Sequence, residues 1–124
     1  MKFIFWMRGK GIEEIGFPVV EAKTVFSALD KLDAVKIYQK FLKLSAKDHL
    51  MEGDVYLAFV CKHNNSFHSG FFTMDTFRPT FFEAPPDFDV FEDYYKLVEK
   101  GFVEDLKVPR VEKDCTPNGG ILNG

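Results

Sequence analysis

Residues 55–62 constrain the fold of this chain more than any other segment. Their sequence, V-Y-L-A-F-V-C-K, holds no charged side chain before its last position. A strand with one face in water alternates polar and apolar side chains, whereas a strand covered on both faces is a continuous apolar run. We therefore expect residues 55–62 to form a central strand with other parts of the protein packed against both of its faces.

The start of the chain predicts a hairpin at the edge of the same sheet. Residues 2–8 and 15–22 are rich in aromatic and branched side chains, and the glycines near position 10 separate them. Pro18 confines part of the second strand to a sheet edge, because proline cannot donate a hydrogen bond to the strand ladder.

A helical region follows this hairpin. Thr24 is a suitable N-cap, and the apolar residues after it recur at the three- and four-residue spacing of one helical face. The spacing changes phase further on. This change predicts either a bend or a second helix capped by Asp33.

The remaining elements are two strands and a final helix. Residues 67–74 predict a partner for the central strand, and residues 76–84 a further strand. Asp89 and Glu92 have the spacing of a capping box, and Gly101 suits the position just after a helix. The buried stripe predicted for this helix consists of Phe88, Phe91, Tyr95, Val98 and Phe102.

The order β-β-α-β-β-(β)-α predicts an α+β fold with a mainly antiparallel sheet of four to five strands and two principal helices. We expect one compact domain over residues 1–108. Residues 109–124 are expected to form an extended arm or a flexible C-terminal tail.

This order has a consequence for self-association. If both helices cover one face of the sheet, the other face exposes an apolar set that needs a cover, since large apolar patches are rare on monomers. The simplest cover is a second copy of the chain in a two-fold homo-oligomer, and the alternative is that one helix or the C-terminal arm crosses to that face. The residues expected at this interface are Tyr56, Val60, Phe67 and Phe71.

Composition and charge narrow the classes of function. The chain has 124 residues and a net charge of −3, without the basic excess of typical nucleic-acid binders. The apolar run at residues 2–8 is too short for a signal peptide or a membrane span, so we expect a cytoplasmic protein with no membrane association. No dinucleotide fingerprint or other cofactor motif is present, and no cofactor is expected.

The segment C-K-H-N-N-S-F-H, residues 61–68, gathers reactive side chains. A two-residue turn at 64–65, or a four-residue loop, would place Cys61 opposite His68 across two strands, with His63 opposite Ser66. Cys61 and His68 are then a candidate catalytic pair, or with His63 three ligands of a zinc ion. A three-residue loop would send the partners to opposite faces. The plainer interpretation is a polar hairpin tip.

Two other groups of residues are candidates for binding. Lys36, Lys40, Lys43 and Lys47 recur at helical spacing and form either an anion-binding stripe or an ordinary solvated helix face. The second group combines arginines with aromatic rings, a combination typical of binding hot spots. Its members are Arg78, Phe81, Phe82, Trp6 and Arg8.

The aromatic excess, 15 phenylalanines in 124 residues, and the absence of a convincing catalytic motif favour binding over catalysis. We expect a small, non-enzymatic binding or regulatory protein that acts stoichiometrically on a partner protein or a small anionic ligand, in the manner of phage-encoded inhibitors. The alternatives are a hydrolase or transferase that uses the Cys61 hairpin, and a nucleic-acid binder that uses the lysine stripe.

Overall fold

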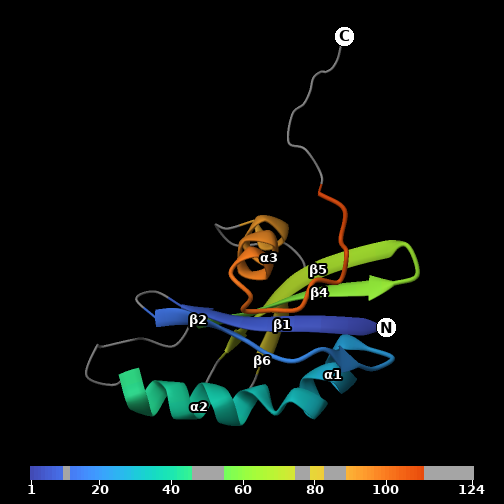
Figure 1. Ribbon diagram of the computed structural model, residues 1–124. Coiled ribbons are helices and arrows are strands. Elements are labelled where there is room, and N and C mark those ends of the chain that lie inside the picture. The colour runs from blue at the N-terminus through green and yellow to red at the C-terminus, as the bar shows by residue number, and fades with distance from the viewer. Residues whose placement is uncertain (10–11, 46–54, 75–78, 83–88, 111–124) are drawn as a thin grey trace.

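An antiparallel sheet lies between two helical layers in the computed structural model, which describes residues 1–9, 12–45, 55–74, 79–82 and 89–110 (Figure 1). Five strands follow the order β2-β1-β4-β5-β6, and the two-residue strand β3 adds to the sheet beside β1. The strands are β1 (Lys2–Gly9), β2 (Ile12–Gly16), β3 (Val20–Glu21), β4 (Val55–His63), β5 (Ser66–Met74) and β6 (Pro79–Phe82). The helices are α1 (Val25–Leu32), α2 (Ala34–Ser45) and α3 (Val90–Glu99). The predicted α+β class is confirmed.

Strand β4 is the central strand that the apolar run predicts. It pairs with β1 on one side and with β5 on the other. Leu57 and Phe59 point into the core beneath α1 and α2, whereas Ala58 and Val60 point into the core beneath α3. Since successive side chains of a strand alternate between faces, a strand with a helical layer on each side has no position for a polar residue.

The first helical region is two helices because Asp33 interrupts it. Thr24 caps α1, and its hydroxyl oxygen accepts the Ser27 N–H at 3.1 Å. Asp33 has a φ of 55°, a left-handed conformation that ends α1. Its carbonyl oxygen accepts the Ile37 N–H at 3.4 Å and so begins α2. Of the two predicted alternatives, the second helix at Asp33 is the one found.

Helix α3 begins and ends where the sequence indicates. The Asp89 carboxylate accepts the Glu92 N–H at 3.1 Å. Gly101 has a φ of 76°, and the N–H groups of Gly101 and Phe102 bond the carbonyls of Val98 and Leu97, which is a Schellman motif.

The predicted buried stripe of α3 is wrong by one residue. The residues buried against the sheet are Val90, Tyr94 and Leu97, whereas Phe102 is 50% exposed. Phe91, Tyr95 and Val98 are partly buried at the side of the same core, and Phe88 lies outside the described residues. Both sets repeat with the period of a helix, and the side that meets the sheet depends on tertiary packing.

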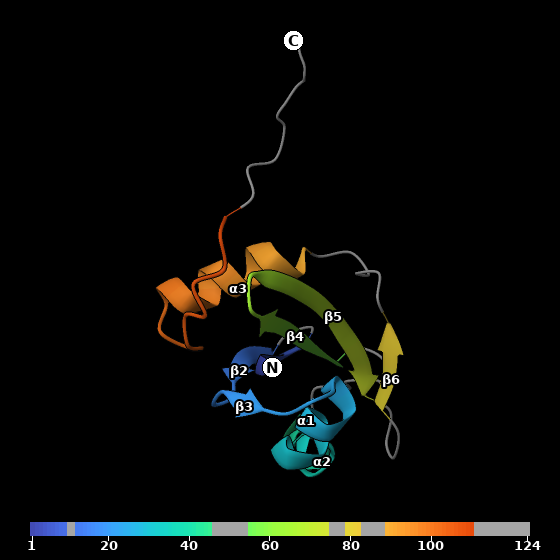
Figure 2. The ribbon, with the colours of Figure 1, turned by 90° about the vertical axis from the view of Figure 1, so that its right-hand side faces the viewer.

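The helices cover opposite faces of the sheet (Figure 2), so the condition behind the expected dimer interface is not met. Val60 and Phe71 are buried in the core beneath α3, and Tyr56 is half-buried at the edge of that core. The half-buried Phe67 lies further along β5, beneath the ammonium group of Lys62. A helix crossing to the second face, the alternative cover, is the arrangement found.

The edges of the domain agree with the proline positions. Pro18 lies between β2 and β3, both of which pair with β1 along one edge of the sheet. Pro79 begins β6 at the other edge, within the predicted strand at 76–84. The predicted tail lies mostly outside the described residues, which end at Arg110. No helix in the described part of the chain is long and apolar enough to cross a membrane.

Candidate functional site

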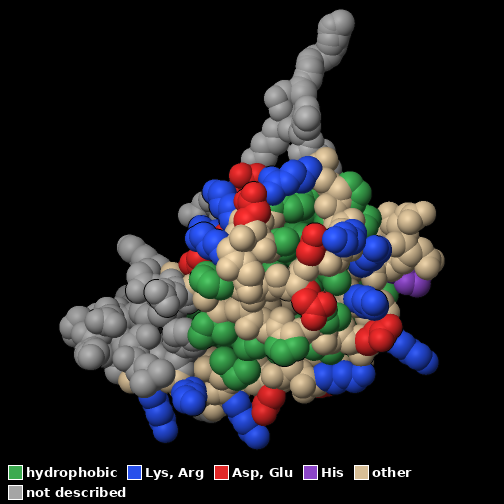
Figure 3. Space-filling view, viewed as in Figure 1, with side chains coloured by type: hydrophobic (Ala, Val, Ile, Leu, Met, Phe, Trp, Pro, Cys, Tyr) green, Lys and Arg blue, Asp and Glu red, His purple; other side chains and the backbone are tan. Residues whose placement is uncertain are grey.

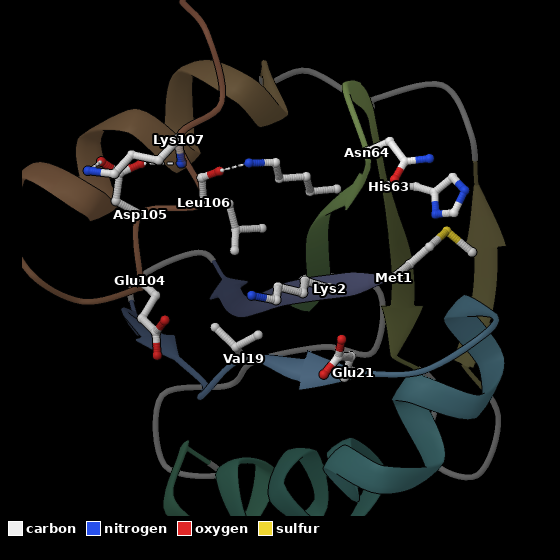
Figure 4. Close-up of a pocket in the computed structure, with 11 residues that line it drawn as sticks. Met1, Lys2, Val19, Glu21, His63, Asn64, Glu104, Asp105, Leu106 and Lys107 are labelled. Carbon is white, nitrogen blue, oxygen red and sulfur yellow. Dashed lines mark hydrogen bonds and ion pairs between the residues drawn. The ribbon is translucent and has the colours of Figure 1, made fainter.

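A cleft of about 460 Å³ opens at the end of the sheet where β1 begins and β4 ends (Figure 4). Strand β3 forms one side of it, and the turn after β4 and the irregular segment 103–108 form the others. We call segment 103–108 the strap. The lining residues are Met1, Lys2, Val19, Glu21, Lys62, His63, Asn64, Glu104, Asp105, Leu106 and Lys107.

Two lysines meet at the floor of this cleft because of strand register. Lys2 of β1 and Lys62 of β4 are directly opposite each other across the sheet. Like charges in this arrangement destabilise a strand pair. Lys62 relieves part of the repulsion, since its ammonium group donates to the Leu106 carbonyl oxygen at 3.2 Å and lies 5.6 Å from the Phe67 ring centroid.

The strap is held in place by α3. The Tyr94 hydroxyl accepts the Leu106 N–H at 2.6 Å and donates to the Glu104 carbonyl oxygen at 3.3 Å. Burial raises the pKa of Tyr94 above its ordinary value, so the hydroxyl keeps the proton that it donates. Leu106 is itself buried in the core beneath α3. The wall of the cleft is thereby anchored by both polar and apolar contacts.

The carboxylates of the cleft differ in their partners. Asp105 accepts the Lys107 N–H at 2.7 Å, and its carboxylate lies 3.6 Å from the Lys107 ammonium group. The side chains of Glu21 and Glu104 make no ion pair within the described part of the chain, and the same holds for Lys2. The cleft therefore presents charged side chains of both signs that form no ion pair with described residues.

The cysteine–histidine hairpin has the register of the two-residue turn, one of the alternatives that the sequence left open, but not the properties of a catalytic pair. Cys61 lies opposite His68 and His63 opposite Ser66, around a two-residue turn in which Asn64 has a φ of 55°. Cys61 is buried, and burial raises the pKa of its thiol. A catalytic thiolate needs a lowered pKa, so this environment disfavours nucleophilic chemistry.

The same residues do not assemble a metal centre. His63 and His68 are exposed, whereas Cys61 belongs to the core beneath α1 and α2. Among the described residues, no three histidine, cysteine, aspartate or glutamate side chains gather closely enough to hold a metal ion.

Two of the predicted partner contacts instead hold the fold together. The Trp6 ring packs beside Tyr94 in the core under α3 and is completely buried. Trp6 is therefore not an exposed contact. Its indole N–H donates to Asp93, and the Arg8 guanidinium bonds the other oxygen of that carboxylate at 2.8 Å. Burial raises the pKa of Asp93, and the contacts with Arg8 and Trp6 oppose that shift.

The other sequence candidates remain predictions. Arg78 lies outside the described residues, and Phe81 and Phe82 are placed only as backbone positions of β6. Lys36, Lys40 and Lys43 are exposed on α2, where Lys36 lies 3.4 Å from Asp33, and Lys47 lies outside the described part. Figure 3 shows basic side chains that project from the α2 side of the molecule into solvent.

Sequence reasoning missed the cleft because its residues come from four distant segments. Lys2 and Lys62 meet through the register of β1 and β4, and no short turn joins those strands. A scan against protein-family models, a search of curated proteins and a search of solved structures each found no match.

Proposed function

We propose that the protein is a non-enzymatic binding protein that holds a small anionic ligand in the cleft at the end of the sheet. The observation that carries this proposal is the directly opposed pair Lys2–Lys62 at the floor of the cleft. An anion seated between two ammonium groups would offset their repulsion and would gain charge-assisted hydrogen bonds. The volume of about 460 Å³ suits a small molecule.

Binding is favoured over catalysis by the chemistry of the neighbouring side chains. Cys61 lies next to Lys62 in the sequence, but its thiol is buried on the other side of the sheet and its pKa is raised. The histidine at the rim, His63, is exposed and lies opposite Ser66 rather than opposite the thiol. Stoichiometric action on a partner protein, as by an inhibitor, would use this cleft through the anionic group of the partner.

The proposal is tested by titrating ¹⁵N-labelled protein with inorganic phosphate at low ionic strength and following the amide shifts. We expect shifts that saturate and that centre on Lys2, Lys62 and Leu106. The double variant Lys2→Gln/Lys62→Gln should weaken phosphate binding about tenfold or more, which corresponds to about 1.4 kcal/mol.

Lys40→Gln/Lys43→Gln is the matched control, because it removes the same two positive charges from exposed positions on α2. Phosphate binding by this variant should stay within about twofold of the unmodified protein. Equal losses in both variants, or shifts centred on α2, would show general electrostatic attraction and would contradict a ligand site in the cleft.

A further inference from the structure

The cleft carries carboxylates that form no described ion pair, as well as lysines. Glu21 lies opposite Lys2 across β3 and β1, so a row of charges runs from Glu21 through Lys2 to Lys62 across three strands. Figure 4 shows Glu104 of the strap and Glu21 of β3 on one side of Lys2, with Val19 between them. Leu106, whose carbonyl oxygen accepts a hydrogen bond from the Lys62 ammonium group, lies on the other side of Lys2.

This division of charge restricts what can bind. A ligand with only negative charge would be attracted by the lysines but repelled by Glu21 and Glu104. A ligand with only positive charge would be attracted by the glutamates but repelled by the lysines. A ligand with an anionic group at one end and a cationic group at the other would satisfy both sides. The apolar residues Val19 and Leu106 line the same cleft and would contact an uncharged middle portion of such a ligand.

We infer that the cleft takes a zwitterion with separated charges, of which a short peptide with both termini free is the matching chemical class. The peptide carboxylate would lie toward Lys2 and Lys62, and its terminal ammonium toward Glu21 and Glu104. The volume of about 460 Å³ is within the range of pockets that enclose ligands larger than a single small ion. This inference rests on the proposed function, because it places the anionic group of the ligand at the same two lysines.

Three peptides that differ only at their ends test the inference. Trialanine has both charges, N-acetyl-trialanine keeps only the carboxylate, and trialanine amide keeps only the ammonium. Titrations followed by amide shifts should show trialanine as the tightest binder. N-acetyl-trialanine and trialanine amide should each bind about fivefold to tenfold more weakly.

A variant of the two glutamates tests whether their side of the cleft binds the terminal ammonium group of the peptide. In Glu21→Gln/Glu104→Gln, trialanine should lose its advantage over N-acetyl-trialanine, whereas phosphate should bind at least as tightly as before. Asp30→Asn/Glu99→Gln is the control, because it removes two negative charges from exposed positions outside the cleft lining, and it should preserve the advantage.

The outcomes separate this inference from the proposed function. If N-acetyl-trialanine binds as tightly as trialanine while phosphate still depends on the two lysines, the zwitterion inference is wrong and anion binding stands. If trialanine does not bind at 10 mM, roughly the limit of weak specific binding, the zwitterion inference is also wrong. Anion binding still stands if phosphate depends on the two lysines. If phosphate also fails to bind the cleft, both proposals fail.

Discussion

At the scale of single residues, Asp93 links helix α3 to the first strand. Its carboxylate is 13% exposed and accepts bonds from the Trp6 indole N–H and the Arg8 guanidinium. Burial raises its pKa, as does the nearby carboxylate of Glu14, and Arg8, Trp6 and Lys96 act in the opposite direction. The net shift is upward, so the charged form of Asp93 is less favourable in the folded protein than in the unfolded chain.

The shift of Asp93 gives a prediction about pH. A carboxyl group with a raised pKa in the folded state contributes stability that is complete below its unfolded pKa and declines as pH rises through the folded pKa. The free energy of unfolding of the unmodified protein, relative to Asp93→Asn, should therefore fall as the pH rises above the ordinary pKa of an aspartate, about 3.9. Urea unfolding of both proteins at several pH values measures this difference. A difference that grows with pH would mean that Arg8 and Trp6 outweigh burial.

At the scale of elements, local signals predicted where helices begin and end. Thr24, Asp89 and Gly101 act through hydrogen bonds or dihedral angles within a few residues of themselves, and all three occupy the predicted positions. The turn that sets Cys61 opposite His68 is also local, but the sequence left its length open, and the structure has the two-residue alternative. The caps of the two helices are different. These features depend on neighbours in sequence, so the sequence alone contains the information.

Features that depend on distant neighbours could not be predicted. The side of α3 that faces the sheet is set by how Tyr94 and Leu97 fit the surface of β4 and β5, and the sequence pattern allows either of two adjacent stripes. The placement of α3 on the face opposite to α1 and α2 removed the predicted interface at Val60 and Phe71. The Lys2–Lys62 pair likewise needed the register of two strands that are separated by two helices.

The close contact between β2 and the end of α3 gives a prediction at this scale. A Cβ atom added at Gly16 would overlap the backbone carbonyl of Phe102, whereas one added at Gly101 would meet no described atom. Gly16→Ala should therefore lower the free energy of unfolding by about 3 kcal/mol. Gly101→Ala should cost only about 1 kcal/mol, from the left-handed φ of 76°.

Chemical denaturation of the two glycine variants at one pH provides the comparison. Gly101→Ala is the matched control, because it adds the same methyl group within two residues of the Phe102 carbonyl. Equal losses in the two variants would show that the end of α3 shifts away from β2 at little cost, and that the contact at Gly16 does not fix the helix.

At the scale of the whole molecule, two separate cores share one sheet. The core beneath α1 and α2 includes Leu29, and the core beneath α3 includes Trp6 and Leu97. Strands β1 and β4 contribute alternate residues to both cores, so neither layer keeps its support if the sheet opens. We therefore expect both layers to unfold in a single cooperative transition.

Leu29→Ala tests this coupling because it weakens one core while the signal is read from the other. Leu29 is 6% exposed, and its truncation should cost about 3 kcal/mol. Trp6, the single tryptophan, reports the α3 side by fluorescence, and far-UV circular dichroism reports all helices and strands. Both signals should shift to the same lower denaturant midpoint, as they should for Leu97→Ala in the other core.

If Leu29→Ala moved the circular dichroism midpoint but left the Trp6 midpoint unchanged, the α3 layer and the sheet would be stable without α1 and α2. The cleft, whose walls come from β1, β3, β4 and the strap, would then not depend on those helices for its shape.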